Sequence, residues 1–527
     1  MENFDEKRSN AKLDVTDNDG ELPFSKEGTA EQHRDYSESW LEKFLALSEK
    51  VDSYGIELKG IHRYLPEERG DGGTRQVLQM VLFWLSGCGG LPSMSGYFLG
   101  PLVFGLSFRD SVSSAIVGTF LGTLIAGYGS IMGPRSGLRQ MVGSRFQFGW
   151  WPAKFIALLN ILTLLGWSVV NCVFGGQILA SISNDKVPLE VGITIITVIS
   201  FSIAIFGIRY VQIFESWFAV PVFITFALLF IASGKKFDLS LASVGDSKTI
   251  AANWLSFCSS CFGITGAWIA IASDYYVQFP ERTPKWKTFT LTTLSIFIPT
   301  MFVGILGIGI ASAAVSKVPS WGLAYDEYGN GGILNASFSG WRSGGKFFVI
   351  ILYISLVSNN ILNTYSIALS SQVWGRFFTR IPRYILSFFS AMVYFVLSMA
   401  GRNKLSQILS SFLPMLTYWC IIYFCILIEE NIFFRRNNLP GLSDVYDWCQ
   451  WNNKPALSRI GFSSVLAFLC GVAGAVIGMC QSYYVGPLAK MVGESGGDIG
   501  MWLAFAFTGL SFPVFRAIEQ HYFPRKL

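Results

Sequence analysis

Charge is the scarcest feature of this sequence. Only 14% of its 527 residues are Asp, Glu, Lys or Arg, whereas soluble globular proteins usually carry about 25%. Apolar residues make up 51% of the chain and the mean hydropathy is +0.43, which excludes a disordered or collagen-like chain. The net charge of +5 is too small to favour nucleic acid as a partner. The composition therefore indicates an integral membrane protein, with the lipid bilayer as its main partner.

Histidine and clustered reactive residues are also scarce. Of the three histidines, His62 and His521 lie outside the apolar segments, which excludes a histidine proton relay across the membrane. No nucleophile, metal-ligand set or carboxylate pair gathers at one membrane depth, so we predict no enzyme, metal site or cofactor. A channel would need repeated polar stripes, and only isolated amides occur.

Charge-free windows of about 20 apolar residues predict membrane-spanning helices, because that length crosses the hydrocarbon core. Such windows lie near residues 78–105, 112–132, 155–181, 190–208, 216–234, 253–273, 288–315, 347–372, 384–400, 405–428, 460–481 and 500–517. We therefore predict an all-α membrane protein with about twelve transmembrane helices, in one domain over residues 76–517.

The polar ends are expected on one side of the membrane. Residues 1–75 lack an apolar signal-peptide core and are predicted to form a largely disordered cytosolic tail. An even number of spans then makes residues 518–527 a short cytosolic C-terminus, and Lys and Arg are more frequent in the loops of that side. Asn335-Ala336-Ser337 falls in an expected outside loop, where Asn335 could carry an N-glycan.

Two spans contain sequences that disfavour a continuous helix. The first contains Ser86-Gly-Cys-Gly-Gly-Leu-Pro-Ser-Met-Ser-Gly96, and the sixth contains Phe257-Cys-Ser-Ser-Cys-Phe-Gly-Ile-Thr-Gly-Ala-Trp268. Breaks in spans one and six are typical of an inverted five-helix repeat with a substrate site at the midplane. The alternative is close helix packing through small residues.

Amides lie at the centre of the eighth span. Asn359 and Asn360 are adjacent there, and Asn363 follows one turn later. Adjacent residues point about 100° apart on a helix, so one interhelical hydrogen bond cannot serve both amides. Because unpaired amides are costly in hydrocarbon, we expect one structural and one functional Asn.

Indoles also lie away from the interfaces where tryptophan usually gathers. Trp167 and Asn171 share a face of the third span, and Trp268 follows the expected break in the sixth. Two indoles can stack on the faces of a flat heteroaromatic ring while amides bond its edge. This pattern favours binding of a small, flat ligand without covalent chemistry.

At these residues the sequence resembles the nucleobase–cation symporter family, and within it the fungal purine–cytosine permeases. The resemblance runs in colinear order over roughly residues 40–527. It is carried by Gly100-Pro-Leu-Val-Phe-Gly-Leu106, Gly137-Leu-Arg-Gln-Met141, Ser144-Arg145, Gly166-Trp-Ser-Val-Val-Asn171, Asp274-Tyr275, Ser358-Asn-Asn-Ile361, Cys480-Gln-Ser-Tyr-Tyr-Val-Gly486 and Gly496-Gly-Asp-Ile-Gly500.

The resemblance implies a five-plus-five inverted repeat (LeuT-like) with two added C-terminal helices. It also implies alternating access across the plasma membrane and proton-coupled import of cytosine and purines such as adenine, hypoxanthine and guanine. The residues that it implies at the substrate are Trp167, Asn171, Trp268, Asn359, Asn360, Ser86 and Asn363, the last either touching the substrate or shaping the site.

Three positions depart from the permeases that the chain resembles. Cys88 stands where they usually have Asn, and Leu362 replaces a proline. Leu356 replaces one hydroxyl of the pair that holds sodium in bacterial relatives, leaving Ser355. The substrate could therefore be another flat nutrient such as pyridoxine (vitamin B6) or thiamine. A nutrient sensor on the same fold is the remaining alternative.

A leucine cannot ligate sodium, so we expect a proton as the coupling ion. Ser355 is the hydroxyl left from the sodium pair, and the carboxylates nearest the membrane interior are Glu215 and Asp274. These three residues are the candidates for cation coupling. The two carboxylates could instead pair with loop Lys or Arg residues.

Overall fold

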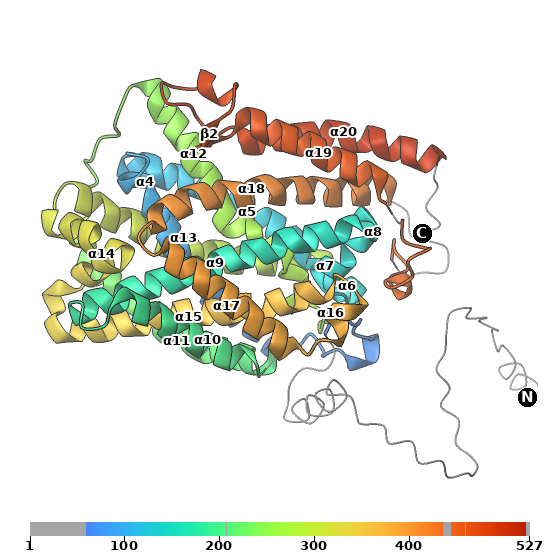
Figure 1. Cartoon of the computed structure of the whole chain (residues 1–527), viewed down its shortest axis with the longest axis horizontal. Helices are drawn as coiled ribbons and strands as arrows, with labels where there is room; N and C mark the ends of the chain where they lie inside the picture. Colours follow the sequence, from blue (N-terminus) through green and yellow to red (C-terminus); the bar gives the residue numbers. More distant parts are fainter. Residues whose placement is uncertain (1–59, 207, 436–443, 459, 523–527) are drawn as a thin grey trace, which may run out of the picture. The chain divides into compact units, whose positions relative to one another are not determined.

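The computed structural model describes residues 60–206, 208–435, 444–458 and 460–522. In these residues the chain forms helices and one short hairpin (Figure 1). The first half contains α2 Thr74–Cys88, α3 Leu91–Tyr97, α4 Leu99–Leu102, α5 Phe108–Ser130, α6 Met132–Ser136, α7 Gln140–Gly143, α8 Arg145–Phe148, α9 Pro152–Ser183, α10 Leu189–Ala204 and α11 Ile208–Ser233. The second half contains α12 Ser247–Gly266, α13 Lys285–Val315, α14 Pro319–Ser337, α15 Arg342–Gln372, α16 Arg376–Arg380, α17 Arg383–Gly401, α18 Leu405–Glu429, α19 Phe462–Gly478 and α20 Gly500–Tyr522.

Short elements connect these helices. The 3₁₀ turns are η1 Pro66–Glu68, η2 Gly234–Lys236, η3 Ala267–Ala270, η4 Ala272–Tyr275, η5 Ser339–Trp341, η7 Trp448–Gln450 and η8 Ala489–Met491, and η6 Glu430–Phe434 is a π-helical turn. The hairpin pairs β1 Cys480–Gln481 with β2 Tyr484–Val485 in antiparallel register.

The helices confirm an all-α membrane protein. Eight described helices are long and apolar enough to cross a bilayer, and the bent pair formed by α2 with α3 and α4 makes a ninth. α10 and α19 are shorter apolar helices, and α12 has 20 residues. These twelve elements follow the order of the twelve windows that the sequence indicates, although the count of twelve spans stays a prediction.

The first span is broken where its glycines and proline predict. α2 ends at Cys88, α3 begins at Leu91, and the two segments are bent by 46°. A Cβ on Gly89 would lie 2.6 Å from the Leu85 carbonyl oxygen and 2.8 Å from Pro299 Cβ, so only glycine fits. The Leu91 N–H, left free by the break, donates to Ser355 Oγ at 3.0 Å. The break therefore docks on α15.

The sixth span breaks later than its small residues suggest. α12 stays helical through Cys258 and Gly263 and ends at Gly266, where the 3₁₀ turns η3 and η4 follow. The small residues instead allow close packing, since a Cβ on Gly263 would lie 2.2 Å from the Leu413 carbonyl oxygen of α18. The sixth span is therefore interrupted after Gly266, and the small residues before that point serve close helix packing, the alternative prediction for this segment.

The last two helices form a pair beside the rest of the described bundle. α19 and α20 lie side by side, next to α18 (Figure 1). Between α5 and α9 the chain folds into the three short helices α6, α7 and α8. The side chain of Gln140 there donates to the Tyr423 hydroxyl at 2.8 Å, which ties this segment to α18.

The structure differs from the prediction for the N-terminal tail and for the loop expected to hold Asn335. Residues 60–73 are ordered against the bundle, because the Tyr64 N–H donates to the Gly137 carbonyl oxygen at 2.9 Å and the Gly70 N–H to that of Gln278 at 2.8 Å. The expected disordered tail therefore does not extend over residues 60–73. The rest of that prediction concerns residues 1–59, which, like residues 523–527, lie outside the described ones.

The glycosylation site expected at Asn335 lies inside α14 rather than in an open loop. Its Nδ2 donates to the carbonyl oxygen and the hydroxyl of Ser181, at 3.2 and 3.0 Å. A glycan would be attached to this same nitrogen. The geometry therefore disfavours the N-glycan.

Candidate functional site

A cavity lies where the two broken spans meet the third and eighth spans. It is lined by residues of α2, α3, α9, α12, η3 and α15, and none of these lining residues carries a charge: Gly87, Pro92, Ser93, Thr163, Leu164, Trp167, Ile264, Ala267, Trp268, Ile271, Asn359 and Asn363. Apolar and aromatic groups predominate, with a few hydroxyls and amides among them. This composition is typical of a pocket for a small neutral molecule.

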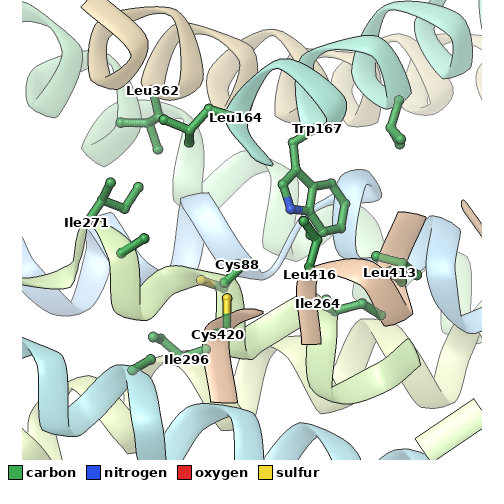
Figure 2. Packing of buried hydrophobic residues seen from close by; sticks show 14 of the residues in the cluster. Cys88, Leu164, Trp167, Ile264, Ile271, Ile296, Leu362, Leu413, Leu416 and Cys420 are labelled. Carbon is green, nitrogen blue, oxygen red and sulfur yellow. The ribbon is translucent and has the colours of Figure 1, made fainter. Parts of the chain in front are cut away.

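The two predicted indoles both line this cavity. Trp167 projects from α9 toward Leu416 (Figure 2), and its ring packs edge-on against Phe412 with centroids 5.9 Å apart. Trp268 lies in η3, and its ring packs edge-on against Trp84 with centroids 5.3 Å apart. Each indole is thus held in place by a second aromatic ring.

Asn359 joins three elements at the cavity wall. Its Oδ1 accepts hydrogen bonds from Asn171 Nδ2 at 2.9 Å and from Asn363 Nδ2 at 3.1 Å. Its own Nδ2 donates to the Gly87 carbonyl oxygen at 3.1 Å, at the break of the first span. Asn359 and Asn363 line the cavity, whereas Asn171 is fully buried behind Asn359 and supports it.

The other two predicted substrate residues lie outside the cavity lining. Asn360 is fully buried, and its Nδ2 lies 3.8 Å from Cys172 Sγ on α9. Ser86 precedes the lining residue Gly87, and its hydroxyl is 3.2 Å from that of Ser358 on α15. Of the two adjacent amides of the eighth span, Asn359 thus lies at the cavity and Asn360 among helices, as the 100° separation of neighbours predicts.

Sequence reasoning missed two hydroxyl residues of the lining, Thr163 and Ser93. Thr163 lies four residues before Trp167 and so shares its helix face, a signal that the sequence already contained. Its hydroxyl accepts a hydrogen bond from Trp419 Nε1 at 3.2 Å. That third indole comes from α18, and no pattern in the sequence links it to the site.

The three cation-coupling candidates have different surroundings. The Ser355 hydroxyl donates to the Leu352 carbonyl oxygen at 2.7 Å and accepts from the Leu91 N–H. Asp274 lies in η4 and accepts from the Gln140 N–H at 2.6 Å. Glu215 is fully buried in α11, and neither carboxylate oxygen has a hydrogen-bond partner in the described part of the chain.

Comparison with known proteins identifies the family. Residues 64–503 match the family described as permease for cytosine/purines, uracil, thiamine, allantoin. The chain belongs to this family. It is therefore a multi-pass membrane transporter and not an enzyme, in agreement with the resemblance drawn from the sequence.

Two fungal relatives differ in their similarity to this permease. The vitamin B6 transporter TPN1 of Saccharomyces cerevisiae is 46% identical, over 91% of this chain and 90% of the relative. The purine-cytosine permease fcyB of Emericella nidulans is 32% identical, over 93% of each chain.

Solved structures agree on the fold. Mhp1, a nucleobase-cation-symport-1 family transporter in a closed conformation with bromovinylhydantoin bound, matches with a TM-score of 0.67 at 14% identity, over 89% of this chain and 97% of Mhp1. The inward-facing conformation of Mhp1 matches with a TM-score of 0.62. The predicted transporter fold is confirmed, while the details of the inverted repeat stay a prediction.

Proposed function

We propose that this permease imports vitamin B6, in the form of a neutral pyridine such as pyridoxine, across the plasma membrane by proton symport. Both termini lie in the cytosol in this proposal. The observation that carries it is the uncharged cavity between Trp167 and Trp268, with Asn359 at its wall. In this proposal a flat ring lies between the two indoles, with its polar edge toward the amides and the Thr163 hydroxyl.

Vitamin B6 is favoured over cytosine and purines by similarity and by the altered positions. The 46% identity to a vitamin B6 transporter exceeds the 32% identity to a purine-cytosine permease over similar lengths. Leu362 lies close to the cavity, since a Cβ on Gly87 would be 3.5 Å from both Leu362 Cδ1 and Trp268 Cη2. An apolar side chain at this position suits the ring methyl group of pyridoxine, which cytosine and the purines adenine, hypoxanthine and guanine lack.

The hydrogen bonds among the residues of the cavity wall also favour vitamin B6 over a nucleobase. The Asn359 oxygen accepts from two amides and its nitrogen donates to the backbone, so this amide has little free capacity for a nucleobase edge. The hydroxymethyl and hydroxyl groups of pyridoxine can bond the Ser93 hydroxyl instead. The Thr163 hydroxyl already donates to the Leu159 carbonyl oxygen at 2.9 Å and accepts from Trp419 Nε1, so it can only accept one further hydrogen bond. Cytosine and purines remain the second candidate, because Asn359 and Asn363 both line the cavity as the family resemblance implies.

The surroundings of Ser355 and Leu356, the positions that correspond to the sodium-binding pair of bacterial relatives, support a proton as the coupling ion. The Ser355 hydroxyl is engaged by the backbone of α3 and α15, and its neighbour Leu356 is fully buried and apolar. Sodium needs several oxygen ligands, and a leucine side chain supplies none.

Uptake of radiolabelled pyridoxine and cytosine tests the proposal, in cells that lack their own permeases, at pH 5.5 and pH 7, where most of the pyridoxine is neutral. We expect pyridoxine uptake that rises in acid and that excess cytosine, adenine or thiamine leaves unchanged. Cytosine uptake blocked by purines, without pyridoxine uptake, would assign the chain to nucleobases instead. Surface expression without uptake of any of these compounds would favour a sensor.

A further inference from the structure

Glu215 is a buried carboxylate without a counter-charge. It lies in α11 and is 0% exposed, and neither of its oxygens makes a hydrogen bond among the described residues. The Ser86 and Ser358 hydroxyls lie where they can act as hydrogen-bond donors to this carboxylate, although neither meets the full hydrogen-bond geometry. Those two hydroxyls lie 3.2 Å from one another. The carboxyl therefore faces a hydroxyl pair that bridges α2 and α15.

The other two coupling candidates are already occupied by the backbone. Asp274 accepts the Gln140 N–H at 2.6 Å, which fixes η4 to the segment before α9. Ser355 bonds the Leu91 N–H and the Leu352 carbonyl oxygen. Protonating Asp274 would weaken the charge-assisted hydrogen bond from the Gln140 N–H, whereas no hydrogen bond of this kind is weakened at Glu215.

Because Glu215 is buried, the free energy of the protein depends strongly on whether its carboxyl is ionised. An unpaired carboxylate in a low-dielectric interior is costly, and a protonated carboxyl needs only one acceptor, which the hydroxyl pair can supply. The ionisable groups that interact with this carboxyl are the thiol of Cys88 on α2 and the phenol of Tyr275 in η4. Among described residues, α15 presents Ser358 to it, and α10, α13 and α14, which also pack on α11, present no ionisable partner. No cation in the described chain offsets the charge.

The same hydroxyl pair adjoins the substrate cavity. Ser86 is followed by Gly87 and Ser358 by Asn359, and both of these neighbours line the cavity. Asn359 Nδ2 also donates to the Gly87 carbonyl oxygen, one residue along from the Ser86–Ser358 contact. Two adjacent contacts thus hold the break of the first span on α15. A proton at Glu215 acts on the Ser86–Ser358 contact, and a ligand at Asn359 acts on the contact between Asn359 and the Gly87 carbonyl oxygen.

We propose that Glu215 carries the coupling proton of this transporter, and that the Ser86–Ser358 pair links its protonation to substrate binding at the first-span break. The proposal rests on proton symport as the proposed function. A proton entering from the acidic side converts the carboxylate to a carboxyl that donates to the hydroxyl pair. Release of the proton to the other side restores the anion, and no covalent bond changes.

Purified protein in liposomes separates coupling from transport. A one-unit pH gradient can sustain about a tenfold concentration gradient for a substrate that moves with one proton. We expect the wild type to approach this ratio with radiolabelled pyridoxine. Glu215→Gln should accumulate pyridoxine only to a ratio of about 1, while it still exchanges labelled for unlabelled pyridoxine when no pH gradient is present.

Two further variants complete the test. Glu429→Gln is the matched control, because Glu429 on α18 also has a buried oxygen without a partner but lies outside the described cavity lining, and it should accumulate like the wild type. Glu215→Asp keeps the carboxyl and should accumulate with a shifted pH midpoint, which guards against misfolding of the Gln variant.

The outcomes distinguish the two proposals. Gradient-driven accumulation by Glu215→Gln at the wild-type ratio would overturn the role of Glu215 and leave the transport proposal intact. Equal losses in Glu215→Gln and Glu429→Gln would also overturn it. Absence of pyridoxine uptake by the wild type, with cytosine accumulated instead, would overturn the substrate, and the same variants would then be compared with cytosine.

Discussion

Asn359 and Asn360 show how far apart two adjacent, identical residues can be in role. Asn359 lines the cavity and takes part in three hydrogen bonds, with Asn171, Asn363 and the Gly87 carbonyl oxygen. Asn360 faces Cys172 between helices and lies outside the lining. The two amides are therefore separable by mutation.

We predict that Asn359→Ala lowers uptake at limiting substrate by roughly 5- to 150-fold. The change removes the amide that positions Asn363 and the first-span break at the cavity wall, and we expect the loss of this arrangement to weaken substrate binding by about 1–3 kcal/mol. Asn360→Ala should change the KM by less than about threefold. The measurement is initial uptake rate against substrate concentration, corrected for surface expression. Equal losses in both variants would mean that Asn360 reaches the substrate in another state of the cycle.

At the scale of elements, the hydrogen bonds of one buried carboxylate, Asp498, hold the loop that leads into α20 in place. Asp498 is fully buried and accepts hydrogen bonds from the Tyr418 hydroxyl, from Gln481 Nε2 at 3.0 Å and from the Gly500 N–H at 3.0 Å. Its own N–H donates to Ser256 Oγ on α12 at 2.9 Å. This side chain thus joins the β1–β2 hairpin to α18 and α20, and its backbone joins α12.

The stability that these Asp498 contacts confer should depend on pH. Burial raises the pKa of Asp498 from 3.8 to about 6, against the opposing effect of its hydrogen bonds. Because the folded state then holds a proton that the unfolded chain releases, the free energy of unfolding rises as pH falls from about 6 toward 4. The contribution is on the order of 3 kcal/mol at most.

Asp498→Asn is predicted to remove this dependence, since the amide keeps the shape and does not titrate. Thermal unfolding of the purified protein at pH 4.5 and pH 7.5 measures it. The wild type should gain stability in acid relative to the variant. Parallel pH profiles of the two proteins would show that Asp498 is not the titrating group.

At the scale of the whole molecule, helices α5 and α12 approach so closely that glycine is required between them. A Cβ on Gly122 would lie 2.2 Å from Thr265 Oγ1 and 2.7 Å from the Phe262 carbonyl oxygen. Small residues bring helices together in this way in membranes, where lipid is as apolar as a leucine side chain. α12 continues into η3, so this contact also sets the position of Trp268.

Gly122→Ala is therefore predicted to destabilise the bundle by about 1–3 kcal/mol, because the helices must separate to admit the methyl group. The loss of position at Trp268 should raise the KM as well. Gly344→Ala is the matched control, since a Cβ there would meet nothing within 4 Å. Denaturant unfolding in detergent and uptake kinetics measure the two effects. A Gly122→Ala protein as stable as Gly344→Ala would contradict the close approach.

Much of the fold follows from local sequence. The first-span break needs Gly89, where a side chain would strike the preceding turn, and a proline that follows it. The sixth span shows the limit of such reasoning, because Gly263 has the same composition signal but serves packing against Leu413 of α18. Small residues permit both a break and a close contact, and only the partner helix distinguishes the two.

Part of the candidate site was also predictable. Trp167 and Trp268 both line the cavity, and Thr163 could have been found from its spacing to Trp167. The Trp419 indole could not, because it arrives from a helix more than two hundred residues away to bond Thr163. Contacts of that kind depend on the rotation of α18 about its own axis, which the sequence of α18 alone does not specify.

The sequence by itself determined that the chain enters the membrane, the order of its helices and the residue types at their centres. The physical reason is that hydrocarbon accepts about 20 apolar residues and penalises each polar one. Only the tertiary structure decided that Asn359 rather than Asn360 faces the cavity, and that Glu215 alone among the three coupling candidates keeps its oxygens free of hydrogen bonds in the described chain. Those outcomes depend on which neighbour each helix turns toward, and helix packing across the bundle sets that rotation.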